Sequence, residues 1–144
     1  MDDKIMVGRR KECNSLQMVM ESNEAEFVVV YGRRRVGKTF LINTYYNDSY
    51  AFKLTGLAKK SKQEQLANFH SSLTRYSNGA NYTKPRTWYE AFDMLRNLLE
   101  TTTRDKKRVI FIDELPWMDT RGSNLVSALE HFWNDWASTQ NDIV

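Results

Sequence analysis

The sequence predicts an α/β protein built on a mainly parallel sheet. Three apolar runs, residues 27–31, 50–55 and 109–112, have the length of buried strands, and the stretches between them repeat apolar residues at helical spacing. Strands that alternate with helices in this way form parallel sheets covered by helices. The chain has 144 residues, 41% of them apolar, which is the size of one domain with a hydrophobic core.

The first half of the chain is predicted to hold two helices and two strands. Residues 9–22 form a helix by their apolar spacing, and residues 27–31 are a continuous, β-branched run that predicts a buried parallel strand. Residues 38–46 follow as a helix, and residues 50–55 form a second strand that Gly56 closes. The side chains expected to face the core of this half are Cys13, Leu16, Val19, Met20, Phe40, Leu41 and Tyr45.

The second half is predicted to continue the same alternation. Residues 66–76 and 87–99 repeat apolar side chains along one helical face, and residues 109–112 form a third buried strand. A last helix is expected over residues 123–136, and residues 142–144 look like the start of a further strand. The expected core side chains here are Leu66, Phe69, Leu73, Tyr76, Trp88, Ala91, Phe92, Leu95, Leu99, Leu125, Leu129, Phe132 and Trp136.

The composition argues against several classes of protein. No stretch reaches the roughly 18 apolar residues that a membrane helix needs, and residues 1–4 carry acids where a signal peptide would begin. The single cysteine, Cys13, excludes an internal disulfide. We therefore expect a cytoplasmic protein without a membrane partner. A net charge of +3 permits contact with nucleic acid but does not argue for it.

A phosphate-binding loop is predicted between the first strand and the second helix. Residues 32–39 match the pattern G-x-x-x-x-G-K-[ST] at every fixed position. Gly32 and Gly37 permit the backbone to wrap closely around phosphates, and the free N–H groups of the following helix start favour an anion. Lys38 adds a positive charge at the β- and γ-phosphates, and Thr39 offers its hydroxyl to Mg²⁺. The sequence therefore predicts binding of a nucleoside triphosphate together with Mg²⁺.

The variable positions of the loop and the residue after it belong to the same predicted ATP-binding segment. The arginine side chains either add charge near the phosphates or remain solvated, and we favour solvation because only the backbone of the loop needs to touch the ligand. These further candidate ATP-binding residues are Arg33, Arg34, Arg35, Val36 and Phe40.

An acidic pair follows the third predicted strand. Asp113 comes directly after the apolar run 109–112, at the end of a strand where enzymes with this loop hold Mg²⁺. Glu114 points away from Asp113 in an extended chain, but a bend at Pro116 would let it face the attacking water as general base. The alternative is a pair of surface acids that merely end a strand.

Four segments together resemble the archaeal-type and bacterial AAA+-like ATPases of the STAND branch. The N-terminal segment Val7–Glu12 has the form apolar-Gly-Arg-x-x-Glu, and residues 32–39 carry Gly-Arg-Arg-Arg-Val-Gly-Lys-Thr. Residues Ile112–Trp117 are similar to the acidic strand Ile-Asp-Glu-Leu-Pro-Trp of this group, and Leu129–Trp136 to the helix that follows it.

The resemblance implies a P-loop NTPase three-layer sandwich that binds ATP rather than GTP. It also implies that Gly8 and Arg9 lie near the adenine, although Gly8 is equally explained as a turn residue and Arg9 as a solvated charge. Family members continue with a sensor strand and a helical lid, which would follow Val144. We therefore expect residues 1–144 to be the N-terminal part of a P-loop ATPase domain, with an N-terminal segment and helix (1–26) before the nucleotide-binding core (27–144).

These observations lead to one leading function and two alternatives. In the leading hypothesis the chain binds ATP and the intact protein hydrolyses it with Mg²⁺, with Lys38 and Glu114 as catalytic residues and Thr39 and Asp113 as metal ligands. The first alternative is a nucleotide-binding switch with little turnover, read by a protein partner or a C-terminal domain. The second is an ATPase fragment associated with nucleic acid. The sequence does not give the oligomeric state.

Overall fold

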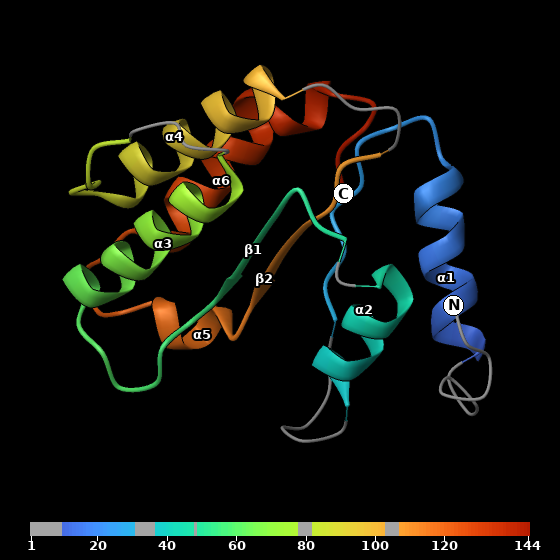
Figure 1. The fold of residues 1–144 in the computed structure, drawn as a ribbon, viewed down its shortest axis with the longest axis horizontal. Helices are drawn as coiled ribbons and strands as arrows, with labels where there is room; N and C mark the ends of the chain where they lie inside the picture. Colours follow the sequence, from blue (N-terminus) through green and yellow to red (C-terminus); the bar gives the residue numbers. More distant parts are fainter. Residues whose placement is uncertain (1–9, 31–36, 48, 78–81, 103–106) are drawn as a thin grey trace.

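The computed structural model describes residues 10–30, 37–47, 49–77, 82–102 and 107–144, which Figure 1 shows as a ribbon. The protein is a mixed α/β structure with a small parallel sheet. Along the chain its elements are α1 (Arg10–Glu21), α2 (Lys38–Tyr46), β1 (Phe52–Thr55), α3 (Lys62–Tyr76), α4 (Trp88–Thr101), β2 (Ile110–Asp113), α5 (Leu115–Met118), α6 (Leu125–Asp135) and the 3-10 helix η1 (Ala137–Thr139).

The sheet consists of β1 and β2, which pair in parallel with Phe52 opposite Ile110. Both strands fall on apolar runs that the sequence predicted. A parallel bridge between Arg108 and Ile143 places the beginning of a third strand beside β2. The predicted strand start at residues 142–144 is therefore confirmed.

The prediction of a buried strand at residues 27–31 is wrong for residues 27–30, while Tyr31 lies outside the described residues. Residues 27–30 belong to no strand, and Phe27, Val28 and Val29 are 51%, 40% and 56% exposed. A strand needs a neighbour along its whole length, because its N–H and C=O groups must be paired by another chain segment. The apolar composition of the run predicted burial but could not supply that neighbour.

Helices lie on both sides of the two strands, with α3, α4 and α6 on one side and α1 and α2 on the other (Figure 1). The larger hydrophobic core joins β1 to α3, α4 and α6, and its fully buried side chains include Phe52, Phe69 and Trp88. A second, separate cluster consists of Cys13 from α1 and Leu41 from α2, with Tyr45 packed against it. The two sides of the sheet therefore have distinct cores among the described residues.

Two helices begin at caps that the side chains make themselves. The Ser61 side chain accepts a hydrogen bond from the N–H of Glu64 at the start of α3, and the Glu64 side chain accepts one from the N–H of Ser61. Thr87 accepts a bond of 3.1 Å from the N–H of Glu90 at the start of α4. Each cap stabilises its helix by about 1 kcal/mol and fixes where the helix starts. No helix in the described ranges is long and apolar enough to cross a membrane.

Candidate functional site

Helix α2 starts at a turn that requires glycine. Gly37 adopts a left-handed backbone conformation (φ 88°, ψ 20°), in which a residue with a Cβ would be strained. The N–H groups of the first turn of α2 have no intrahelical partner and attract an anion. Lys38 and Thr39 lie in this turn and are half-buried. The local structure therefore supplies a positive helix start with an ammonium group and a hydroxyl beside it.

A short hydrogen bond connects this turn to the end of β2. The Thr39 hydroxyl donates to Oδ2 of Asp113 over 2.6 Å, although the two residues are 74 positions apart in the chain. The other carboxylate oxygen, Oδ1, accepts a 3.0 Å bond from the N–H of Glu114. Both oxygens of Asp113 are thus fixed, and the carboxylate faces the start of α2.

The donor set at this contact fits a magnesium ion that a ligand helps to hold. Mg²⁺ prefers oxygen ligands and is usually bound by one or two carboxylates together with substrate phosphates and water. Thr39 and Asp113 supply a hydroxyl and a carboxylate in direct contact. The described residues contain no group of three or more His, Cys, Asp or Glu side chains that could hold a metal alone. The remaining ligands would therefore have to come from phosphate and water.

Glu114 is the corner at which the chain leaves β2. It has a left-handed conformation (φ 57°, ψ 42°) and precedes the short helix α5, in which Pro116 occupies the first turn. Gly56 packs against this corner, since a Cβ at Gly56 would lie 2.4 Å from the carbonyl oxygen of Glu114. The N–H of Gly56 also donates to the carbonyl of Asp113 over 2.9 Å. The close packing of Gly56 holds the acidic pair at the end of both strands.

A buried glutamine that sequence reasoning missed ties α5 to the segment after β1. Gln65 is 1% exposed, and its Nε2 donates to the carbonyls of Leu57 and Trp117 over 2.5 and 3.1 Å. Its Oε1 accepts a 3.0 Å bond from the N–H of Leu57. Gln65 thus connects α3 to the turn that carries Glu114. The only signal in the sequence is a polar residue beside the apolar stripe of a helix, which does not distinguish a buried glutamine from a solvated one.

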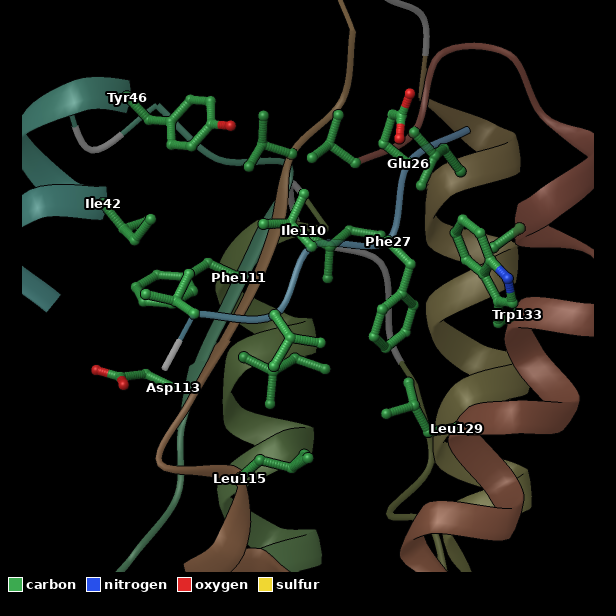
Figure 2. A pocket seen from close by; sticks show the side chains of 18 of the residues that line it. Glu26, Phe27, Ile42, Tyr46, Ile110, Phe111, Asp113, Leu115, Leu129 and Trp133 are labelled. Carbon is green, nitrogen blue, oxygen red and sulfur yellow. The ribbon is translucent and has the colours of Figure 1, made fainter. Parts of the chain in front are cut away.

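A largely apolar cavity of about 430 Å³ adjoins the acidic pair (Figure 2). Its charged lining residues are Lys38, Asp113, Glu114 and Glu26, of which Glu26 lies away from Asp113. The rest of the lining comes from residues 27–30, residues 109–112, residues 143–144 and the helices on either side. The cavity therefore brings three of the predicted site residues, from two distant parts of the chain, to one place.

The structure describes only part of the predicted site. Lys38, Thr39, Asp113 and Glu114 are brought together, and Gly37 forms the turn in front of them. The predicted ATP-binding residues that lie outside the described residues are Gly8, Arg9, Gly32, Arg33, Arg34, Arg35 and Val36.

The expectation that Phe40 packs into the core is wrong. Phe40 is 57% exposed, whereas Leu41 and Ile42 are 3% and 5% exposed. Successive residues of a helix point about 100° apart, so the face of α2 that buries Leu41 and Ile42 leaves Phe40 toward solvent. The exposed ring of Phe40 lies one residue beyond the threonine that contacts Asp113.

Comparison with known proteins adds a family and two relatives. The family described as an ATPase domain predominantly from Archaea matches residues 6–144. An uncharacterized protein of Methanocaldococcus jannaschii is 28% identical over 127 residues, which are 88% of this chain and 25% of that protein. An uncharacterized ATP-binding protein of the same organism is 42% identical over 41 residues, 28% of this chain and 70% of that protein. The chain thus spans about a quarter of the length of the first relative. No solved structure matches significantly.

Proposed function

The chain belongs to the family of ATPase domains found predominantly in Archaea, and on that premise we propose that it binds ATP together with Mg²⁺. In the intact protein we propose that the same site hydrolyses the nucleotide. The observation that carries the proposal is the 2.6 Å hydrogen bond between Thr39 and Asp113. It joins the last residue of the phosphate motif, in the first turn of α2, to the acid at the end of β2. A metal–triphosphate complex needs both parts.

The phosphate end of the nucleotide would be held by the start of α2. Lys38 would place its ammonium group against the β- and γ-phosphates, and the unpaired N–H groups of the first helical turn would add partial positive charge. The backbone of residues 32–37 would complete the contact with phosphate. The candidate side chains around it, which we propose as part of the ATP-binding segment, are Arg33, Arg34, Arg35, Val36 and Phe40.

Thr39 and Asp113 would hold the metal. When bound, Mg²⁺ would neutralise charge on the β- and γ-phosphate oxygens. Thr39 would contribute its hydroxyl oxygen and Asp113 its carboxylate, either directly or through water. The N–H of Glu114 keeps the Asp113 carboxylate in one orientation. The ligands would therefore need little rearrangement when the nucleotide arrives.

Glu114 would accept the proton of the attacking water. It lines the same cavity as Lys38 and Asp113, follows Asp113 directly in the chain, and is half-buried. Its left-handed backbone turns the chain away from the line of β2, which supports a side-chain position different from that of Asp113. Positioning of the water and stabilisation of charge by Lys38 would supply most of the rate enhancement.

Assignment to the STAND branch of AAA+-like ATPases is a finer proposal. It is supported by residues 7–12 and 112–117, which resemble the N-terminal and acidic segments of that branch. It carries with it the placement of Gly8 and Arg9 near the adenine. Substitution of Arg9 by alanine should then weaken binding of ATP more than binding of inorganic triphosphate, which has no base.

Calorimetric titration with ATP and Mg²⁺ tests the binding proposal. Lys38→Ala removes a charged partner of phosphate and should weaken binding roughly 10- to 100-fold. Lys60→Ala is a matched control, because Lys60 is an exposed lysine whose ion pair with Glu64 lies on the protein surface. Equal affinities of the Lys38→Ala and Lys60→Ala variants would refute phosphate binding at the start of α2.

Release of inorganic phosphate tests the hydrolysis proposal separately. Glu114→Gln keeps the shape of the side chain but removes its basicity, so turnover should fall on the order of 100-fold or more while ATP still binds. If the wild-type protein and the Glu114→Gln variant both release phosphate at the background rate, hydrolysis is excluded for the protein tested. Nucleotide binding without turnover would then remain.

A further inference from the structure

Helix α2 contacts both strands of the sheet through one of its faces. Thr39 and Asn43 are four residues apart, which places their side chains one above the other on the same side of the helix. Thr39 donates its hydrogen bond to Asp113 at the end of β2. One turn later, Oδ1 of Asn43 accepts a 3.1 Å hydrogen bond from Nζ of Lys53 in β1. The helix is therefore tied to each strand by one polar side chain.

The two contacts have the spacing that the helix and the strands impose. In the register of the sheet, Thr55 pairs with Asp113, so Lys53 lies two residues before the position that faces the acid. Two residues of a strand span about 6.6 Å, and the four residues from Thr39 to Asn43 span about 6 Å of helix. Helix α2 therefore runs along the sheet in the direction opposite to the strands, with its start at the acidic end.

Lys53 reaches Asn43 because a strand directs alternate side chains to opposite faces of the sheet. The residues on either side of Lys53 are buried in the larger core, and Lys53 itself is half-buried on the side of α2. Its ammonium group lies 5.7 Å from the ring centre of Tyr50 and 5.9 Å from that of Phe111. The Phe111 ring lies on the side of β2 that faces α2 (Figure 2). Both rings attract the positive charge and help to fix the lysine in place.

Asn43 accepts a second hydrogen bond from the same part of the chain. The hydroxyl of Tyr50, two residues before β1, donates to the same Oδ1 over 2.7 Å. A carboxamide oxygen has two lone pairs and can accept both bonds, and the bond from an ammonium group is stronger than one between neutral groups. Asn43, Tyr50 and Lys53 are all half-buried, so water competes less for these bonds than it would on an open surface.

We propose that Asn43 is a positioning residue for the metal in the nucleotide site, an inference that rests on the proposed binding of ATP and Mg²⁺. The hydrogen bonds from Lys53 and Tyr50 set the distance between α2 and the sheet. That distance fixes how far the Thr39 oxygen stands from the Asp113 carboxylate, and the ion has to fit this spacing. Asn43 acts through the position of α2 and touches neither the nucleotide nor the metal.

The contact of Asn43 with β1 matters because the contact of Thr39 with β2 changes when the metal binds. An ion held by Thr39 and Asp113 replaces the direct hydrogen bond that ties the start of α2 to β2. Asn43 lies one turn away and keeps its bonds to Lys53 and Tyr50 in both states. The start of α2 thus stays at one distance from the sheet while the partner of its threonine changes.

The choice between Mg²⁺ and Ca²⁺ reports on this distance. Mg²⁺ requires near-ideal octahedral geometry with oxygens at about 2.0–2.1 Å, whereas Ca²⁺ accepts oxygens at about 2.3–2.6 Å in flexible arrangements. Two protein ligands held at a fixed spacing therefore favour the smaller ion. If α2 loses its tie to β1, this preference should decrease while ATP still binds through its phosphate contacts. General destabilisation of the protein would instead lower the affinity for both metal complexes equally.

Calorimetric titrations with ATP in excess Mg²⁺ and in excess Ca²⁺ give the ratio of the two affinities. Asn43→Ala should lower the preference for Mg²⁺ about fivefold to tenfold relative to the wild-type protein. Asn43→Asp keeps an acceptor oxygen for both donors, so its ratio should stay within about twofold of the wild-type value. Asn97→Ala is the matched control, because Asn97 of α4 also accepts a hydrogen bond from a tyrosine hydroxyl, over 2.9 Å, and is far from α2 in the chain.

Lys53→Met tests the same contact from the side of β1. It removes the donor of the 3.1 Å hydrogen bond but retains an unbranched side chain that can pack against the neighbouring rings. It should lower the preference for Mg²⁺ in the same direction as Asn43→Ala, and it tests the proposal even if Asn43→Ala does not fold.

Three results would overturn the proposal. The first is an unchanged ratio of affinities in a folded Asn43→Ala or Lys53→Met variant. The second is an equally large decrease in Asn97→Ala, which would assign the effect to a general loss of stability. The third is a wild-type protein that binds ATP equally well with either ion. A wild-type protein that binds ATP with neither ion would instead refute the proposed function itself, and this inference with it.

Discussion

Replacing Gly56 by alanine should displace the corner that carries Glu114. The new Cβ would lie 2.4 Å from the carbonyl oxygen of Glu114 and 2.8 Å from Cγ of Met118. Ordinary van der Waals contact begins at 3.4 Å, so the backbone of the corner would have to shift by about 1 Å. Overpacking of this kind costs about 1–3 kcal/mol. A 1 Å displacement of a catalytic group can lower the rate about 100-fold.

The effect on stability can be separated from the effect on the site by a second glycine. Gly122 has a φ of 72° and nothing within 4 Å of the position that a Cβ would take, so Gly122→Ala adds backbone strain of roughly 1 kcal/mol without a steric clash. Urea denaturation of both variants would give the free energies of unfolding, and phosphate release by the intact protein would give turnover. Gly56→Ala should lower turnover and leave ATP affinity within about threefold of wild type, whereas Gly122→Ala should change stability alone.

The reasoning would be refuted by a Gly56→Ala variant that unfolds and hydrolyses ATP like the wild-type protein. That result would mean that the corner yields to an added methyl group without moving Glu114. A variant that loses ATP affinity and turnover equally would also contradict it, because Gly56 touches the acidic corner rather than the start of α2.

Three further predictions concern polar side chains in the core or beside it. Gln65→Ala leaves buried backbone groups unpaired and should lower the free energy of unfolding by about 1–3 kcal/mol in urea titrations. A change below about 0.5 kcal/mol, as is usual for surface positions, would contradict the proposal that Gln65 connects α3 to α5. Burial, reinforced by the neighbouring Tyr45, raises the pKa of Tyr46 to about 12. The neutral phenol therefore stabilises the fold below about pH 10, and this contribution should be lost as the pH rises from about 10 to 12. Urea midpoints compared at about pH 9 and 11 should then show a smaller loss of stability in Tyr46→Phe than in the wild-type protein. Asp142→Ala removes the partner that lies 3.0 Å from Nε of the buried Arg108, and should cost about 1–3 kcal/mol, less than a fully buried pair because the Asp142 side chain is 38% exposed. An unchanged thermal midpoint would argue against that ion pair as a source of stability.

Those parts of the fold that depend on local pattern could be predicted from the sequence. β2 combines a continuous apolar run with an acidic end, and α4 combines an apolar stripe with the capping residue Thr87, so the predicted bounds of both agree with the structure within a residue or two. The sequence also proposed Thr39 and Asp113 as ligands of one metal ion. The structure brings their side chains into contact over 2.6 Å, and their role toward a metal stays a proposal.

Features that depend on a spatial neighbour could not be predicted. The run 27–31 has the composition of a buried strand, but whether it pairs is decided by the chain segment that lies beside it. In residues 24–30 the backbone hydrogen bond is made by Glu26, just before the run, whose N–H donates to the carbonyl of Ile143. The role of Gln65 depends on two carbonyls that are 8 and 52 positions away in the chain. The exposure of Phe40 depends on which face of α2 packs against the protein, and that face carries Leu41 and Ile42. A linear pattern carries none of this information.

The hydrogen bond from Thr39 to Asp113 determines which kind of atom can approach the threonine oxygen next. A hydroxyl has one proton, and here the carboxylate accepts it. Only lone pairs remain on the outward side of that oxygen. An anionic oxygen that approaches it unaccompanied is repelled, while a cation or a hydrogen-bond donor is attracted. The polarity of this one side chain thus requires that a negatively charged ligand reach it through a cation or a hydrogen-bond donor.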